Sequence, residues 1–229
     1  MNETRRDDPF LRNRLDRYDR WLREGSISHS SKVIPVRESI DGEQWVLPTE
    51  QAMEILRQAS SVAVQACECR THYGRCDHPR EVCLLLDDIA DGLVAKHEAR
   101  SVGMDEAAEI LTNANESGLV HLTLYRPDHR VYALCSCCSC CCHDLQIIEA
   151  FGRPELMVRS DYVAVTDREA CIDCGQCTDR CLFGARTWHD GRLVYDLEAC
   201  VGCGLCVTMC PMDATRMVVR ASLSGRPSA

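Results

Sequence analysis

Apolar residues recur at helical spacing near the start of the chain. The spacing predicts a helix from Pro9 to about Gly25, with Asp8 as its N-cap and Pro9 at the first helical position. Its apolar stripe consists of Leu11, Leu15, Tyr18 and Leu22. We expect this stripe to pack on the protein's own body rather than on a partner, because the opposite face carries the balanced charges of a solvated helix.

Further along, extended and helical patterns alternate. Residues 26–48 have an extended pattern around Pro35, and residues 49–60 predict a helix that starts at Thr49. The apolar run Val62–Ala66 predicts a buried strand. From Pro79 onwards a second helix is predicted, because Val82, Leu85, Leu86 and Ile89 fall on one helical face.

Two more elements precede the first dense run of cysteines. Residues 105–117 predict an acidic helix that Gly118 ends. Residues 119–125 and 130–134 predict a β-hairpin that turns around Pro127. The second strand of that hairpin would carry the following cysteines to the strand end near Cys67.

The segment 161–219 is an internal repeat. A shift of 29 residues superimposes 171–181 on 200–210 and Ala185 on Ala214. Such a repeat predicts two equivalent halves related by a pseudo-twofold axis. Between them, residues 186–195 have the pattern of a hairpin.

Composition narrows the class of protein. The chain has 229 residues, 18 of them cysteine, and a net charge of −9. It has no apolar run long enough for a membrane span and no signal-peptide pattern at its start, so we expect a cytoplasmic protein without a membrane span. In a reducing compartment dense cysteine favours metal over disulfides. The acidic balance argues against nucleic-acid binding.

Eight cysteines follow a strict spacing. Cys171, Cys174, Cys177 and Cys181 have the pattern C-x2-C-x2-C-x3-C, and so do Cys200, Cys203, Cys206 and Cys210. Thiolates two residues apart on a coiled loop can each reach one iron corner of a cube, and Gly175, Gly202 and Gly204 help these loops turn. A zinc site, with four ligands in two separated pairs, does not fit duplicated triplets.

This stretch resembles the bacterial two-[4Fe-4S] ferredoxins. The resemblance implies that the fourth cysteine of each motif crosses to the other cluster. One cluster would then be held by Cys171, Cys174, Cys177 and Cys210, and the other by Cys200, Cys203, Cys206 and Cys181. The family has proline after the fourth cysteine, and here Leu182 takes that place after Cys181. We predict that its free amide raises the potential of that cluster.

The other ten cysteines form two groups. They are Cys67, Cys69, Cys76, Cys83, Cys135, Cys137, Cys138, Cys140, Cys141 and Cys142. The first group, with its C-x-C-R, C-D-H-P and V-C-L motifs, and the second, C-x-C-C-x-C-C-C, resemble a broader group of 4Fe-4S proteins that end in a two-cluster ferredoxin. Val46-Leu47-Pro48 fits that group too. The implied role is a redox protein, an electron carrier or electron-input subunit.

The ligands among these ten stay open at this point. One or two further iron–sulfur clusters are expected, and a zinc or copper knot at 135–142 or redox-active vicinal disulfides or persulfides are the alternatives. Possible histidine ligands are His72, His78, His97, His121 and His143. Arg70 would offset cluster charge or form a surface salt bridge.

These patterns together predict an α+β protein. We expect an N-terminal helix and connector (1–48), a cysteine-rich mixed α/β domain (49–160), a ferredoxin-like dicluster domain built as a βαβ repeat (161–219) and a disordered tail (220–229). Dinucleotide-binding, P-loop, nucleophile-elbow and radical-SAM motifs are absent from the sequence. An electron carrier is therefore favoured over an enzyme, with a protein partner that offers a basic docking patch. The alternatives are a small catalytic reductase subunit with an open-site cluster in 67–142, and a redox or metal sensor.

Overall fold

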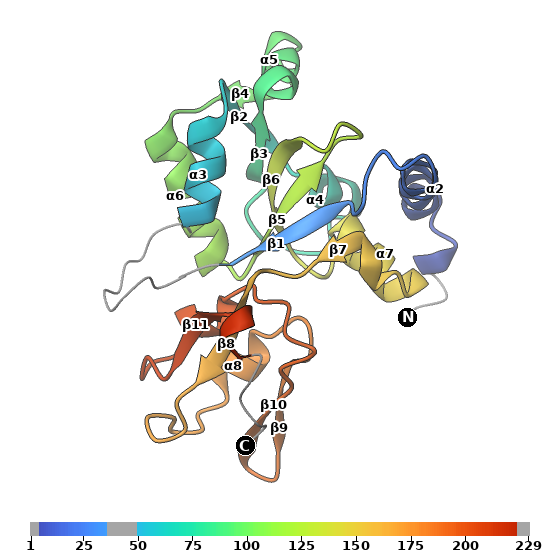
Figure 1. The fold of residues 1–229 in the computed structure, drawn as a ribbon. Coiled ribbons are helices and arrows are strands. Elements are labelled where there is room, and N and C mark those ends of the chain that lie inside the picture. Colours follow the sequence, from blue (N-terminus) through green and yellow to red (C-terminus); the bar gives the residue numbers. More distant parts are fainter. Residues whose placement is uncertain (1–4, 36–49, 224–229) are drawn as a thin grey trace.

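The computed structural model describes residues 5–35 and 50–223. Figure 1 shows a larger N-terminal part, coloured blue to yellow, above a smaller C-terminal part, coloured orange to red. Each part contains helices and strands, which confirms the predicted α+β class. The expectations for Val46-Leu47-Pro48 and for Thr49 as a helix cap concern residues outside the described ranges.

A seven-stranded sheet organises the N-terminal part, in the order β4-β2-β3-β6-β5-β1-β7. Its strands are β1 (Ser31–Ile34), β2 (Val62–Ala66), β3 (Glu81–Leu86), β4 (Arg100–Ser101), β5 (Val120–Tyr125), β6 (Val131–Cys137) and β7 (Met157–Val158). Neighbours are antiparallel except β1 and β7, which are parallel. The central strands β3 and β6 carry cysteines, and Cys83 pairs directly with Cys135.

Helices cover both faces of this sheet. They are α2 (Pro9–Arg23), α3 (Glu50–Gln58), α4 (Glu68–Tyr73), α5 (Asp87–Ala95), α6 (Met104–Glu116), α7 (His143–Phe151) and the 3₁₀ helix η1 (Pro154–Leu156). Figure 1 shows α3 and α6 side by side, and Leu56 and Leu111 from these helices pack on Leu84 of β3. The next residue, Leu85, packs on α5 from the opposite face, as the alternation of side chains along a strand requires.

The N-terminal helix confirms its prediction. The Asp8 side chain accepts a hydrogen bond from the Phe10 amide at 2.9 Å, so it caps α2. Leu11 and Tyr18 are buried against Ile147 of α7 and Leu156 of η1. The apolar stripe therefore packs on the protein's own body, beside α7 at the edge of the sheet (Figure 1).

The helix predicted from Pro79 to Ile89 is wrong. Residues Glu81–Leu86 form strand β3, and the helix α5 begins only at Asp87. The run from Val82 to Leu86 is buried at every position because the central strand is covered on both faces. A short apolar run of this kind satisfies helical and strand spacing alike, and here pairing with β2 and β6 decides between them.

The extended pattern predicted for 26–48 is seen in β1, and residues 36–48 lie outside the described ranges. The predictions for residues 49–125 other than the helix from Pro79 are confirmed within a residue or two. Helix α3 accounts for 49–60, strand β2 for 62–66 and helix α6 for 105–117. Strands β5 and β6 form the predicted hairpin, and β6 continues as far as Cys137. Gly118 follows α6 with a φ of +82°, a backbone conformation that favours glycine.

The C-terminal part contains two strand pairs. Strand β8 (Tyr162–Thr166) pairs with β11 (Thr215–Val219), and β9 (Arg186–His189) with β10 (Arg192–Tyr195). Short helices α8 (Gln176–Asp179) and α9 (Leu205–Thr208) complete the two βαβ halves. Both helices begin directly after a left-handed glycine and end before Cys181 and Cys210.

The predicted disordered tail begins with an ordered turn. Residues Arg220–Leu223 form the 3₁₀ helix η2, and residues 224–229 lie outside the described ranges. The Arg220 guanidinium donates to the Cys200 carbonyl at 2.8 Å, so this turn is attached to the C-terminal part.

The two parts are packed together by a shared apolar cluster. Val33, Leu122 and Leu145 of the N-terminal part contact Val201 and Leu205 of the C-terminal part. Polar contacts surround this cluster: the Ser160 amide donates to the Val201 carbonyl at 2.9 Å, and Lys32 pairs with Asp161 at 2.7 Å. The loop that carries the second cysteine motif is therefore fixed against the cysteine-rich part.

Candidate metal centres

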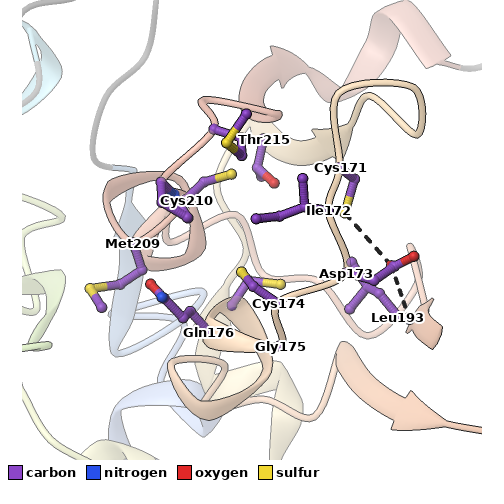
Figure 2. Close-up of a pocket in the computed structure, with 13 residues that line it drawn as sticks. Cys171, Ile172, Asp173, Cys174, Gly175, Gln176, Leu193, Met209, Cys210 and Thr215 are labelled. Carbon is purple, nitrogen blue, oxygen red and sulfur yellow. Dashed lines mark hydrogen bonds between the residues drawn. The ribbon is translucent and has the colours of Figure 1, made fainter. Parts of the chain in front are cut away.

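The first cavity of the C-terminal part gathers cysteines from both motifs. It is lined by Cys171, Cys174, Cys177 and Cys210. Figure 2 shows Cys171 and Cys174 on one loop and Cys210 across the hollow from them. Cys174 is exposed, and Ile172 and Met212 at the rim are 59 % and 49 % exposed. We call this the outer cavity, because solvent reaches both its thiols and its apolar rim.

The second cavity gathers the other four cysteines of the repeat. It is lined by Cys181, Cys200, Cys203 and Cys206. Cys200 and Cys206 are buried, and Cys203 packs against the apolar cluster that joins the two parts of the chain. We call this the inner cavity. Each cavity thus combines three thiols of one motif with the fourth thiol of the other.

The two cysteine motifs differ at one backbone position. Gly202 has a φ of +77°, and a Cβ there would collide with the backbone carbonyl oxygen of Tyr162. The repeat places Asp173 at the equivalent position, also with positive φ (+49°). Its Oδ1 lies 3.7 Å from Cys171 Sγ (Figure 2). The inner loop therefore requires glycine, whereas the outer loop tolerates a charged side chain beside a thiol.

Arg186 is a functional residue that the sequence analysis missed. It is 3 % exposed, and its guanidinium lies 3.8 Å from Cys177 Sγ of the outer cavity while it also lines the inner one. Burial opposes its charge, yet the thiolates of Cys206 and Cys177 hold its pKa above the ordinary value. Its Nη2 is buried without a hydrogen-bond partner in the described chain. One feature of the sequence could have indicated Arg186. The 29-residue shift of the repeat places it opposite Thr215, so the two halves differ at this position.

The ten remaining cysteines are brought together beside strands β3 and β6. They come from the end of β2 and helix α4, the loop before β3, the strands themselves and the turn between β6 and α7. All of them are free thiols. The predicted meeting of the 67–83 and 135–142 groups is what the structure shows, since Cys83 and Cys135 are cross-strand neighbours.

Contacts between sulfur atoms divide these ten thiols into two sets. In the first set Cys67 contacts Cys69 and Cys83, Cys83 contacts Cys135, and Cys142 contacts Cys69 and Cys137. In the second set Cys140 contacts Cys138, Cys76 and Cys141. We call the first the six-thiol set (Cys67, Cys69, Cys83, Cys135, Cys137 and Cys142) and the second the four-thiol set (Cys76, Cys138, Cys140 and Cys141).

The six-thiol set lines a cavity of about 120 Å³, and Cys138 of the four-thiol set lines it as well. Arg14, Tyr132, His143 and Asp144 also line it, and of these only His143 was a ligand candidate from the sequence. His143 Nδ1 lies 3.2 Å from Cys69 Sγ. Burial, together with the charge of Arg14, lowers the pKa of His143 to about 3, so its ring is neutral near pH 7. Several thiols and a neutral imidazole therefore face one space.

Arg70 and the other histidines proposed from the sequence lie in different surroundings. Arg70 is only 1 % exposed and donates to the backbone carbonyls of Pro79 and Ser136, so the alternative of a surface salt bridge is wrong. His72 stacks on Phe10 at 4.0 Å, and His121 is buried beside the Ser136 hydroxyl at 3.0 Å. His78 and His97 do not line the outer, inner or six-thiol cavity.

Comparison with known families bears on the C-terminal part. Residues 170–214 match the family described as 4Fe-4S dicluster domain, which covers about a fifth of the chain. A search of the curated proteins finds no match to this chain. Residues 170–214 are therefore a dicluster segment that takes two [4Fe-4S] clusters. Helices long and apolar enough to cross a membrane are absent from the described chain.

The thiols present fit such clusters. Each cluster of this type takes four cysteine thiolates, and each of the two cavities presents four. Bound there, a cluster supplies one-electron redox chemistry at low potential, while the chain determines its charge environment and its access to solvent.

Proposed function

We propose that this protein relays electrons to or from a partner redox enzyme, with the outer cavity as the point of exchange and the inner cavity as the link to the cysteine-rich part. The observation that carries this proposal is the difference in exposure between the two cavities. Cys174 is exposed at the outer one, whereas Cys200 and Cys206 are buried at the inner one. An electron that arrives at the surface would reach the interior by passing through both clusters.

The ligand sets proposed for the two clusters follow the cavities. Cys171, Cys174, Cys177 and Cys210 would hold the outer cluster, and Cys200, Cys203, Cys206 and Cys181 the inner one. This crossing keeps the clusters close together, because each motif reaches into both cavities. Four thiolates for each cluster leave no iron open to a substrate, which suits relay rather than catalysis.

The partner's surface would be apolar at its centre and basic around it. Residues 161–219 contain nine Asp and Glu against five Arg and no Lys, a net charge of −4. The exposed side chains of Ile172 and Met212 lie at the rim of the outer cavity. Opposite charges steer encounter and make the association rate fall with salt. We therefore expect a basic redox protein to dock over the outer cavity.

A further iron–sulfur cluster is proposed for the six-thiol set. The inner cavity and the six-thiol set are connected by one apolar cluster, in which Cys203 packs beside Cys137 and Cys142. A four-iron cluster needs four of the six thiols. The relay would then continue from the inner cluster into the cysteine-rich part without leaving the protein.

A second candidate function is a small reductase subunit. The observation in its favour is the polar lining of the six-thiol cavity, where Tyr132, His143 and Asp144 stand near the thiols. Such groups can donate protons to a substrate that a cluster reduces. A cluster that used fewer than four thiols would leave an iron open to that substrate.

The experiment that tests the relay is a count of iron and acid-labile sulfide in protein purified without oxygen, followed by an EPR-monitored reductive titration. About twelve iron per chain is expected, eight from the dicluster segment and four from the six-thiol set. Eight would leave the relay intact and refute the third cluster. Fewer than about four iron, or zinc in both dicluster cavities, would refute the relay itself.

Serine substitutions test the ligand sets. Cys174→Ser should perturb the EPR signal and potential of the outer cluster and leave the inner cluster unchanged, and Cys203→Ser should do the reverse. If either variant altered both clusters equally, the proposed assignment would be wrong. A new EPR signal on adding a small ligand such as cyanide to the reduced protein would favour the reductase.

A further inference from the structure

The four-thiol set has the dimensions of a site for one metal ion. Cys76 Sγ lies 3.8 Å from both Cys138 Sγ and Cys141 Sγ. All four sulfurs of the set, with that of Cys140, lie within 4.8 Å of one another. A tetrahedron with metal–sulfur distances of about 2.3 Å has sulfur–sulfur edges of about 3.8 Å. The thiols therefore stand where four ligands of a single ion would stand.

A four-iron cluster does not fit this spacing. Its thiolates bind four different irons and surround a core of eight atoms, so their sulfurs lie farther apart than those that share one ion. The eight dicluster cysteines are all described, and they do not form a group with ligand atoms within 4.8 Å. In the C-terminal part the cysteine sulfurs are therefore far enough apart to surround a cluster. In the N-terminal part the sulfurs of the four-thiol set are close enough together to bind one ion.

The surroundings of the set suit four thiolates. The Arg70 guanidinium lies near the Cys138 sulfur, the backbone amides of Cys141 and Arg75 lie near the sulfurs of Cys138 and Cys141, and the Arg75 side chain donates to the Cys140 carbonyl at 3.1 Å. One divalent ion with four thiolates carries a charge of about −2, which two neighbouring guanidinium groups can offset. Amide and guanidinium donors to sulfur stabilise bound thiolates in the same way.

We propose that Cys76, Cys138, Cys140 and Cys141 bind one structural zinc ion, separate from the iron–sulfur clusters. Zinc is favoured over a single ferrous ion because divalent zinc binds a given site more tightly. Four protein ligands close the site, so the ion has no position for substrate. Its role would be to attach the loop around Cys76 to the turn 138–141, whose flanking residues Cys137 and Cys142 line the six-thiol cavity.

The test is metal analysis and zinc X-ray absorption on the full chain purified without oxygen. The expected result is one zinc per chain with four sulfur neighbours at about 2.3 Å. Cys140→Ser should lose that zinc and keep its dicluster iron. Cys69→Ser is the matched control, since Cys69 is also half-buried but belongs to the six-thiol set, and it should keep the zinc.

A second variant covers the case in which Cys140→Ser does not fold. Cys140→His should retain zinc with three sulfur ligands and one nitrogen, a change that X-ray absorption resolves. Wild-type protein without zinc, zinc bound by oxygen and nitrogen, a single iron in a four-sulfur site, or loss of four iron in Cys140→Ser would each overturn the proposal. None of these outcomes alters the two dicluster clusters, so failure of the zinc site is distinguishable from failure of the relay.

Discussion

The buried charge of Arg186 should raise the potentials of both dicluster clusters. Its guanidinium lies 3.8 Å from Cys177 of the outer cavity and lines the inner cavity as well. Reduction adds one negative charge to a cluster, and a nearby positive charge stabilises that state. We therefore predict that Arg186→Met, which keeps an unbranched, flexible side chain but shortens it and removes its charge, lowers both potentials.

The magnitude follows from distance. At an effective dielectric constant of about 20, unit charges about 4 Å apart interact by about 4 kcal/mol, and charges about 8 Å apart by about 2 kcal/mol. The electron spreads over the cluster, so its mean distance from the guanidinium lies in this range. With about 59 mV for each 1.4 kcal/mol in a one-electron step, the expected fall is about 80–170 mV.

The assay is an EPR-monitored redox titration of wild type, Arg186→Met, Arg186→Lys and Arg192→Met. Arg192 lies on the paired strand β10 and is exposed, so its substitution controls for net charge and should shift neither potential measurably. Arg186→Lys keeps the charge and should recover most of the shift. Unchanged potentials in Arg186→Met with full iron content, or a fall confined to one cluster, would refute the position of this charge between the two clusters.

Four other substitutions give distinct results. Asp173→Asn removes a carboxylate 3.7 Å from Cys171 Sγ. That carboxylate is partly exposed, so at a dielectric constant near that of water its interaction with the cluster charge is about 1 kcal/mol. The same titration should therefore show a rise of about 40 mV in the outer cluster and no change in the inner one. Gly202→Ala should lose about four iron, because its Cβ meets strand β8. Gly184→Ala, at a φ of +66° with nothing within 4 Å, should keep its iron and lose about 1 kcal/mol of stability. Burial lowers the pKa of His121 from 6.5 to about 4. As the pH falls from 7 to 5, the imidazole therefore becomes protonated in the unfolded chain but not in the folded one, which lowers the free energy of unfolding. Denaturation at pH 7 and pH 5 should show wild type losing about 2 kcal/mol that His121→Phe does not lose, and equal losses would contradict this pKa.

Local signals predicted most of the elements. The first helix has a cap, a proline and an apolar stripe in one segment, and the structure follows them closely. The dicluster repeat was equally predictable, because the spacing of the cysteines in each motif is set by the positions of the irons that they bind. Strand β3 was mistaken for a helix because its neighbours β2 and β6, which lie far away in the sequence, decide its conformation.

The division of the ten N-terminal cysteines was not predictable from spacing. Cys76 and Cys138 are 62 positions apart and meet only because the sheet brings the loop before β3 beside the end of β6. Adjacent cysteines then have different partners: Cys137 contacts Cys142 of the six-thiol set, whereas Cys138 contacts Cys76 and Cys140 of the four-thiol set while it also lines the six-thiol cavity. Side chains alternate between the two faces along strand β6, and a tight turn follows it; together they give neighbouring cysteines different partners. Neither feature can be recognised in a sequence run that consists mainly of cysteine.

The central claim is that electrons enter or leave at the outer cavity, and the rate of oxidation of the reduced protein by ferricytochrome c, a basic acceptor, tests it most directly. Ile172 lies at the outer rim and is 59 % exposed, and Val219 is comparably exposed on β11 and does not line that cavity. Lysine at either position changes net charge equally. We predict that stopped-flow rates fall severalfold in Ile172→Lys, stay near wild type in Val219→Lys, and decrease with salt in the wild type. Equal rates in both variants, or a rate independent of salt, would contradict it.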